Sequence, residues 1–464
     1  MHYNRTYMNI YFSGIGGVGI GPLAEIARDA GYSVQGSDAQ TGPVFDRLEQ
    51  SGVRVSTDQT GVFLQECHAE QPIDWFVHTA ALPDNHPELE LARSLGIRTA
   101  KRDELLSAII ADKNLKLIAI AGTHGKTTTT GMMVWTLREL GVTVSYSVGT
   151  TLSFGPSGHY EPGSEYFVYE CDEFDRNFLA FRPFLSLITS IDYDHPDTYP
   201  TRAQYSQAFN DFLSVSDHVI MWQHDARDGI NPPARAWVLQ DDEVMDVALA
   251  GQHNRSNATL VYKAVEYLQA AGGLMVSSDE ESGFPPVARQ GASANDHLAP
   301  SGSETEDGHQ AETHNVKSVL ANFPGTDRRF EKLAEGLYSD YGHHPIEIAA
   351  TLQLARELSN HVVLVYQPHQ NTRQHEVRSQ YTDCFELAEQ IYWLPTYLSR
   401  ENTDLETLTP EQLTEHLTNR DRVTIADMDD TLWQAITDAR NSGKLVLCMG
   451  AGSIDSWVRS RLTK

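Results

Sequence analysis

The sequence lacks the features that mark disulfide-stabilised, zinc-binding or membrane-spanning proteins. Its four cysteines, Cys67, Cys171, Cys384 and Cys448, are scattered, and no two of them form a C-x-x-C pair. This spacing excludes a disulfide framework and a cysteine-based zinc site, so reduced, buried thiols are expected. No apolar run reaches the roughly 18 residues that a membrane-spanning helix needs.

Basic residues are also scarce. The chain of 464 residues has 35 Lys and Arg against 63 Asp and Glu, a formal net charge of −28. This balance argues against binding to nucleic acids or anionic membranes, and its simplest consequence is solubility. An anionic substrate would have to be held locally, by glycine-rich loops, helix N-termini, single cations or a metal ion. Residues 1–10 have no apolar signal-peptide core, so we expect a cytoplasmic protein.

Short apolar runs alternate with helical patterns, which predicts α/β domains with parallel sheets. The length fits about three domains. Helices are expected at 22–30, 127–140 and 257–270, and 223–246 is predicted to be irregular. Strands are expected at 8–13, 33–36, 75–79, 117–121, 166–169, 185–191, 362–366, 391–394, 423–426 and 445–448. From 272 to 318 the chain is polar and acidic without an apolar period, which predicts a flexible surface insert.

The strongest local signal is a glycine-rich loop between an expected strand and an expected helix. It reads Gly122, Thr123, His124, Gly125, Lys126, Thr127 and Thr128. Glycines let backbone N–H groups converge on phosphate oxygens, and the helix directs its positive end at the same place. Lys126 can neutralise the β- and γ-phosphates, and the Thr127 hydroxyl can bind Mg²⁺. Ile120 replaces the first glycine of the full pattern, so we predict ATP binding by a shortened P-loop.

A second glycine-rich turn lies near the N-terminus, again between a strand and a helix. It contains Gly14, Gly16, Gly17, Val18 and Gly19. Such a turn is typical of dinucleotide binding, with Asp38 placed to contact a ribose hydroxyl of NAD. The same backbone cradle also fits a different diphosphate, such as that of a UDP-sugar. Because the chain already has an ATP loop, we favour the UDP-sugar and keep an NAD-dependent oxidoreductase as the alternative.

Together, these stretches resemble the Mur ligase family. The matching segments are 14–21, 36–38, 121–130, 170–175, 192–199, 251–257, 328–330, 340–345 and 367–373, and they follow the family's order over nearly the whole chain. The resemblance implies an α/β protein of three domains. It implies a Rossmann-like UDP-substrate-binding domain at 1–111, a central P-loop ATPase-like domain at 112–325 and a Rossmann-like amino-acid-binding domain at 326–464.

The resemblance also implies a reaction. ATP would phosphorylate the carboxylate of UDP-N-acetylmuramate, and the amine of L-alanine would attack the acyl phosphate, in cytoplasmic peptidoglycan precursor synthesis. The protein would act with ATP and Mg²⁺ as a monomer or weak dimer, with no nucleic-acid or membrane partner. The implied catalytic residues are Lys126, His195, His343 and Arg373.

The resemblance assigns further residues to ligands. Mg²⁺ would be held by Thr127, Glu170 and His195. ATP would be contacted by the phosphate loop and by Asn254, Asn257 and Arg329. The amino acid would be contacted by Tyr341, His343, His369 and Arg373.

Each assignment has a plainer alternative. Glu170 and Asp172 could end a solvated strand, and His195 or the two asparagines could cap a helix. Arg373 could be an ordinary surface charge. The adjacent His343 and His344 could bind a transition metal, but neighbouring residues seldom hold one ion together.

The sequence departs from the family pattern at several points. Gln370 stands where the alanine-adding members carry Arg, which puts the choice of amino acid in question. Asp192 replaces a Glu and Ser453 an Asn, and the short stretch 222–251 implies a reduced antiparallel sheet in the central domain. Two other functions stay open: a recycling ligase that adds a tripeptide, for which Tyr341-Gly342 would be atypical, and a nucleotide-binding protein without ligase activity.

Overall fold

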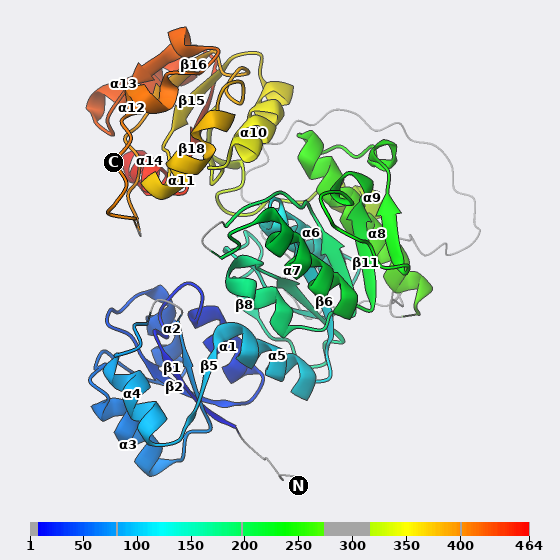
Figure 1. Ribbon diagram of the computed structural model, residues 1–464, viewed down its shortest axis with the longest axis vertical. Coiled ribbons are helices and arrows are strands. Elements are labelled where there is room, and N and C mark those ends of the chain that lie inside the picture. The colour runs from blue at the N-terminus through cyan, green and yellow to red at the C-terminus, as the bar shows by residue number, and fades with distance from the viewer. Residues whose placement is uncertain (1–7, 80–81, 196–197, 273–315, 400, 464) are drawn as a thin grey trace, which may run out of the picture.

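The computed structural model describes residues 8–79, 82–195, 198–272, 316–399 and 401–463 (Figure 1). They form three α/β units in chain order, and each unit has its own sheet. The predicted insert at 272–318 lies almost wholly outside the described residues. Its last residues, 316–318, correct that prediction, because they begin helix α9 (Val316–Ala321), which buries Val319 and Leu320.

The N-terminal unit is a parallel sheet in the order β3-β2-β1-β4-β5. Its strands are β1 (Asn9–Ser13), β2 (Ser33–Ser37), β3 (Arg54–Ser56), β4 (Trp75–His78) and β5 (Arg98–Lys101). Its helices are α1 (Gly21–Asp29), α2 (Pro43–Gln50), α3 (Val62–Glu70), α4 (Pro87–Ser94) and α5 (Arg102–Asp112). The strand order reverses at β1, which places a ligand crevice at the carboxyl end of that strand.

The central unit has the strand order β12-β11-β10-β6-β9-β7-β8, and only β7 and β8 pair antiparallel. Its strands are β6 (Lys116–Ala121), β7 (Val144–Ser147), β8 (Gly158–His159), β9 (Tyr166–Glu170), β10 (Leu185–Ile188), β11 (His218–Trp222) and β12 (Ala236–Leu239). Its helices are α6 (Lys126–Glu139), α7 (Arg202–Val215), α8 (Gln252–Ala270) and α9, with 3₁₀ helices η1 (Phe174–Ala180), η2 (Gln223–Asp225) and η3 (Asp241–Glu243). Alternate residues of β6 enter different core clusters, so both faces of the sheet are covered.

Three expectations for this unit were wrong in detail. The stretch 223–246 is not wholly irregular, because β12 pairs with β11 as an edge strand. The Arg235 guanidinium fixes the start of β12 by donating to carbonyl oxygens at the end of α7. Strand β10 ends at Ile188, since the following residues turn over the phosphate loop, and α8 begins five residues before the expected 257.

The C-terminal unit has the strand order β13-β14-β18-β15-β16-β17, with only β13 and β14 antiparallel. Its strands are β13 (Glu331–Ala334), β14 (Leu337–Asp340), β15 (Val362–Tyr366), β16 (Gln390–Trp393), β17 (Val423–Ile425) and β18 (Leu445–Met449). Its helices are α10 (Pro345–Leu358), α11 (Asn371–Val377), α12 (Pro410–Thr414), α13 (Asp430–Asn441) and α14 (Ile454–Leu462), with 3₁₀ helices η4 (Arg378–Gln380) and η5 (Arg420–Arg422).

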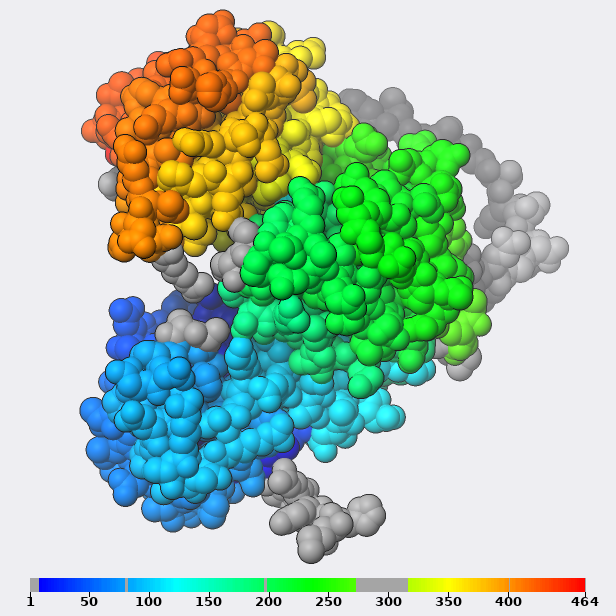
Figure 2. All heavy atoms as spheres, viewed as in Figure 1, coloured from blue at the N-terminus to red at the C-terminus, as the bar shows by residue number. Residues whose placement is uncertain are grey.

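The N-terminal and central units share one hydrophobic core. Leu105 and Ile109 of α5 belong to the same buried cluster as Phe178 and Phe212 of the central unit. Helix α1 packs against β8, where a side chain on Gly158 would lie 2.7 Å from Pro22. The C-terminal unit has separate cores and contacts the opposite end of the central unit (Figure 2). Within the described ranges, no helix combines the length and apolarity needed to cross a bilayer.

Candidate active site

The phosphate loop follows β6 and leads into α6, as the sequence predicts. Gly122 has φ of +137°, and a Cβ there would lie 2.4 Å from Thr189 Oγ1, so only glycine fits. Gly125 has φ of +82° and caps α6. The buried Asn257 amide lies behind it, 3.0 Å from where a Gly125 Cβ would stand. The backbone conformation of the loop therefore requires glycine, and helix α8 packs against the loop through Asn257.

Lys126 is paired with a residue that the sequence did not single out, Glu173. Its ammonium donates to Glu173 Oε2 at 2.8 Å and to the carbonyl oxygen of Gly122 at 2.6 Å. Glu173 is fully buried, and its Oε1 has no hydrogen-bond partner among the described residues. Burial acts to lower the pKa of Lys126, but Glu173 and nearby carboxylates outweigh it and raise that pKa. The ammonium therefore stays charged beside the loop.

Thr127 and Glu170 meet at the start of α6. The Thr127 hydroxyl donates to Glu170 Oε1 at 2.8 Å, and Gly149 N donates to Glu170 Oε2 at 2.7 Å. Both side chains present oxygen, the donor that Mg²⁺ prefers. No group of three or more His, Cys, Asp or Glu in the described chain could hold a metal alone. The residues therefore fit an ion that takes most of its ligands from water and phosphate oxygens.

His195 and Lys126 lie near different oxygens of Glu173. His195 Nε2 is 3.8 Å from Glu173 Oε1, whereas Lys126 donates to Oε2. The His195 backbone has φ of +57°, an unusual conformation for a residue other than glycine. Its neighbour Asp194 pairs with Arg373 of α11 at 3.3 Å, which joins the central and C-terminal units. Burial acts to raise the pKa of Asp194, but Arg373 and His195 outweigh it and lower that pKa.

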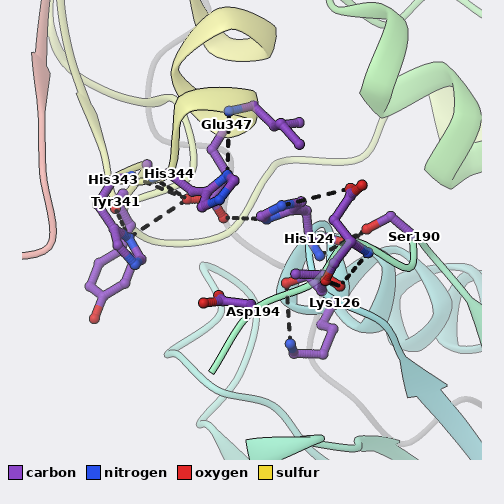
Figure 3. Close-up of polar contacts among 12 residues, drawn as sticks. His124, Lys126, Ser190, Asp194, Tyr341, His343, His344 and Glu347 are labelled. Carbon is purple, nitrogen blue, oxygen red and sulfur yellow. Dashed lines mark hydrogen bonds and ion pairs between the residues drawn. The ribbon is translucent and has the colours of Figure 1, made fainter. Parts of the chain in front are cut away.

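Glu347 of α10, a second residue that the sequence did not single out, connects the C-terminal unit to the phosphate loop (Figure 3). Its Oε1 lies 3.4 Å from His124 Nδ1 and 4.0 Å from Arg329 Nη1, and its Oε2 accepts from the backbone N–H of His343 at 3.1 Å. Burial acts to raise the pKa of Glu347, but its contacts with His124, His343 and Arg329 outweigh burial and hold it well below its usual range.

The histidines at 343 and 344 have different partners and do not form a pair for one metal ion. His343 Nδ1 lies 3.2 Å from the Tyr341 carbonyl oxygen, whereas His344 Nδ1 accepts from Ile346 N and its ring packs on His124. Burial lowers the pKa of His343 and of His344 to about 4, so both rings are neutral near pH 7. The His343 ring contacts those of Tyr341 and His369.

These groups face a polar cavity of about 140 Å³ between the central and C-terminal units. It is lined by Thr123, His124, Gly125, Lys126, Thr127, Glu170, Asp194, His195, Arg329, His343, His344, Glu347 and Arg373. A neighbouring cavity of about 480 Å³ includes Thr128, Asn254, Asn257 and Arg329 in its lining. The Asn254 amide donates to the Ala250 carbonyl oxygen, a bond that fastens the start of α8. The small cavity beside the phosphate loop thus adjoins a larger one that has room for a nucleoside base.

A third cavity, of about 450 Å³, lies between the N-terminal and central units. Gly14, Gly17, Val18, Gly19 and Asp38 line it, and the Asp38 carboxylate accepts from Gly16 N at 2.9 Å. Asp38 therefore braces the turn in this structure. The cavity lining also contains two cations that the sequence did not single out, Lys101, which pairs with Asp175, and Arg102, which lies next to Gly19.

Three family models match the chain: Mur ligase family, catalytic domain at 9–114, Mur ligase middle domain at 120–231, and Mur ligase, glutamate ligase domain at 328–452. This chain belongs to the Mur ligase family. It is 32% identical to UDP-N-acetylmuramate--L-alanine ligase of Renibacterium salmoninarum over 96% of this chain and 93% of the other. It is 30% identical to the protein of that name from a Nocardioides species, with the same coverage.

Solved structures support the Mur ligase fold. UDP-N-acetylmuramate-alanine ligase of Thermotoga maritima has a TM-score of 0.67 at 21% identity, covering 98% of this chain and 99% of the other. A murein peptide ligase from Psychrobacter arcticus has a TM-score of 0.58 at 20% identity, covering 98% of each chain. At these identities the likeness shows the arrangement of the three units.

The predicted residues of this Mur ligase lie around three cavities. Residues 123–127 of the phosphate loop, together with Glu170, His195, Arg329, His343 and Arg373, line the 140 Å³ cavity. Thr128, Asn254 and Asn257 line the adjoining 480 Å³ cavity, and Gly14, Gly17, Val18, Gly19 and Asp38 line the 450 Å³ cavity. His369 and Tyr341 lie beside His343 without lining the small cavity. Glu347 was detectable as a carboxylate that follows the His-His-Pro turn, but nothing local in the sequence indicated that it crosses to His124.

Proposed function

We propose that this Mur ligase uses ATP to join the lactyl carboxylate of UDP-N-acetylmuramate to L-alanine, in cytoplasmic peptidoglycan precursor synthesis. The observation that carries the proposal is the small polar cavity, where the phosphate loop, a buried acidic group and the C-terminal residues His343 and Arg373 meet. The names of the relatives support this choice of substrates. The domain boundaries given above and a monomer or weak dimer remain predictions.

The UDP portion occupies the cavity between the N-terminal and central units in this proposal. The N–H groups at the end of the turn, at Val18 and Gly19, provide a cradle for a diphosphate where the chain leads into α1, whereas those of Gly14, Gly16 and Gly17 donate within the protein and shape the turn. Arg102, whose Nη1 lies 3.3 Å from where a Gly19 Cβ would stand, supplies the compensating positive charge. A chain of net charge −28 needs such a local cation to hold an anionic substrate.

Thr127 and Glu170 would hold Mg²⁺, and His195 would contact a second ion. When bound, Mg²⁺ neutralises charge on the transferred phosphoryl group. The Lys126 ammonium neutralises phosphate charge and stays charged because Glu173 accompanies it. The carboxylate displaces ADP to form an acyl phosphate, and attack by the amine then releases phosphate.

The amine acceptor lies on the side of the C-terminal unit. His343 is neutral, so its ring can accept a hydrogen bond from an amine without repelling it. Arg373 pairs with Asp194 and presents its remaining donors to the acceptor carboxylate. This region has Gln370 where the alanine-adding members carry Arg, so it lacks one positive charge. Acceptors other than L-alanine should therefore be tested as well.

The proposal is tested by release of phosphate from ATP with substrates added singly and together. Release should require both UDP-N-acetylmuramate and an amino acid, and L-alanine, glycine, L-serine and the recycling tripeptide should be compared as acceptors. Release that needs the tripeptide would assign the chain to recycling. ATP binding without release in the presence of any acceptor would identify a nucleotide-binding protein that is not a ligase.

A further inference from the structure

A buried hydrogen-bond network lies behind the amino-acid side of the site, inside the aromatic core of the C-terminal unit. Its members are Gln374 of α11, Tyr366 at the end of β15 and Tyr381 beyond α11, each at most 1% exposed. The Tyr381 hydroxyl donates to Gln374 Oε1 at 2.7 Å. Gln374 Nε2 donates to the His369 carbonyl oxygen at 3.0 Å.

The network continues to the loop that carries His343. Because the Tyr381 hydrogen is used on Gln374, the Tyr366 hydroxyl supplies the next hydrogen of the network. The Tyr366 hydroxyl shares this hydrogen between the Tyr381 oxygen, 3.0 Å away, and the His343 carbonyl oxygen, 3.4 Å away. The three side chains therefore span the interior between the backbones of His369 and His343.

Packing alone does not require these polar groups. The tyrosine rings lie among aromatic neighbours, with Tyr366 5.0 Å from Trp393 and Tyr381 5.5 Å from Phe385 between ring centroids. Phenylalanine would fill the same space. Polar groups in such a core cost free energy unless they are paired, and a paired network makes one arrangement unique. The hydroxyls and the amide therefore serve the loops that they reach.

The backbone at Gln370 gives an independent reason. This residue has φ of +59°, a backbone conformation that residues other than glycine rarely adopt. Its N–H donates to the Tyr397 carbonyl oxygen, its carbonyl oxygen accepts from Gln374 N, and the Gln374 side chain fixes the preceding residue, His369. Such conformations persist only where the surroundings over-determine them.

We propose that Gln374, Tyr381 and Tyr366 are positioning residues that set the spacing between His343 and His369, and through it the binding of the amine acceptor. The rings of these two histidines lie 5.7 Å apart, at the C-terminal side of the site. The role in acceptor binding rests on the ligase function proposed above, whereas the role in holding the two loops does not.

The kinetic test uses the full chain with Tyr381→Phe, Gln374→Leu and the double variant. Each single variant should raise KM for the acceptor about five- to tenfold, the loss expected when a buried partner is left unsatisfied. KM for ATP and for UDP-N-acetylmuramate should stay within about twofold, and the double variant should be no worse than the poorer single one. Tyr392→Phe, in the neighbouring strand β16, is the matched control because its hydroxyl takes no part in the network.

Hydrogen exchange separates this proposal from the proposed function, because it needs no turnover. Backbone amides in 341–344 and 367–370 should exchange faster in Tyr381→Phe than in Tyr392→Phe. Unchanged exchange, an unchanged acceptor KM, or equal rises in all three KM values with a lower Tm would overturn the positioning role. If the wild-type chain releases no phosphate with any acceptor, the proposed function fails, and the exchange data still decide whether the network holds the loops.

Discussion

Single side chains of this Mur ligase determine where negative charge can be held. The phosphate loop places Lys126 against the buried Glu173, and the N-terminal turn places Arg102 beside Gly19. Lys126 was recognisable from sequence because its role follows from a local pattern. Arg102 was not, since its proximity to the turn arises only when β5 and α5 pack beside β1 and α1.

Arg102→Gln should raise KM for the UDP-substrate at least tenfold and leave kcat close to wild type. The physical reason is the loss of a charge-assisted hydrogen bond that is made equally in the ground state and the transition state. Steady-state kinetics with the UDP-substrate varied would measure it. Arg98→Gln is the control, because Arg98, at the start of β5, stacks over Trp75 of β4 and does not line the cavity. Equal KM values for the two variants would contradict the assignment.

His344 makes stability depend on pH. Its pKa is about 4 in the folded chain because burial and His124 disfavour the charged ring, against about 6.5 when unfolded. Between these values the unfolded chain binds more protons, so the free energy of unfolding falls as the pH falls. The loss between pH 7 and pH 5 should be roughly 1–2 kcal/mol from this residue.

Urea unfolding at several pH values would measure this slope. His344→Asn keeps a side-chain acceptor at the start of α10 but removes the titrating ring, so its slope should be shallower than that of the wild type. The slope should not vanish, because burial also lowers the pKa of His253 and His343. An unchanged slope would mean that His344 contributes no proton linkage.

One loop of the central unit and one of the N-terminal unit show how elements depend on glycine for different reasons. Gly122 and Gly31 both have positive φ. A Cβ on Gly122 would collide with Thr189 and Ser190, whereas a Cβ on Gly31, in the N-terminal unit, would have no neighbouring atom of the described chain within 4 Å. Gly31→Ala should therefore cost only about 1–2 kcal/mol of stability for the left-handed backbone and leave ATP binding intact.

Gly122→Ala should lose at least tenfold in ATP affinity as well as stability, because the loop must move away from β10 to admit the methyl group. Calorimetric titration with a non-hydrolysable ATP analogue, together with Tm for both variants, would compare them. Nucleotide binding by Gly122→Ala at wild-type affinity would show that the loop does not hold the phosphates.

Local patterns predicted the central elements well and the peripheral ones poorly. Strands β1, β6, β15 and β18 are continuous apolar runs because both faces of their sheets are covered, so the sequence alone reveals them. Strand β12 is short and half-exposed at the edge of its sheet, and Arg235, just before it, is held by contacts with the end of α7. The residues that the resemblance assigned to the phosphates and Mg²⁺ lie together around the small cavity, whereas Glu173 and Glu347 are brought beside them by tertiary contacts.

At the scale of the whole molecule, the candidate site consists of cavities at the two junctions between neighbouring units. The N-terminal and central units share a core, which fixes the cavity proposed for the UDP-substrate. The C-terminal unit is joined to the central one by polar contacts, such as Glu347 with His124, Arg373 with Asp194 and Glu357 with Arg255. Such contacts can be remade without exposing a core, so we expect the C-terminal unit to be the one that adjusts during turnover.

The central claim is that a phosphoryl group passes to a carboxylate at this junction before the amide forms. The most direct measurement supplies UDP-N-acetylmuramate with its lactyl carboxylate labelled with ¹⁸O and follows the label after turnover with the active acceptor. The proposed reaction predicts one labelled oxygen in each phosphate released, since the bond between carbon and that oxygen breaks when the amine attacks. Unlabelled phosphate, released in step with amide formation, would contradict an acyl phosphate and the reaction proposed here.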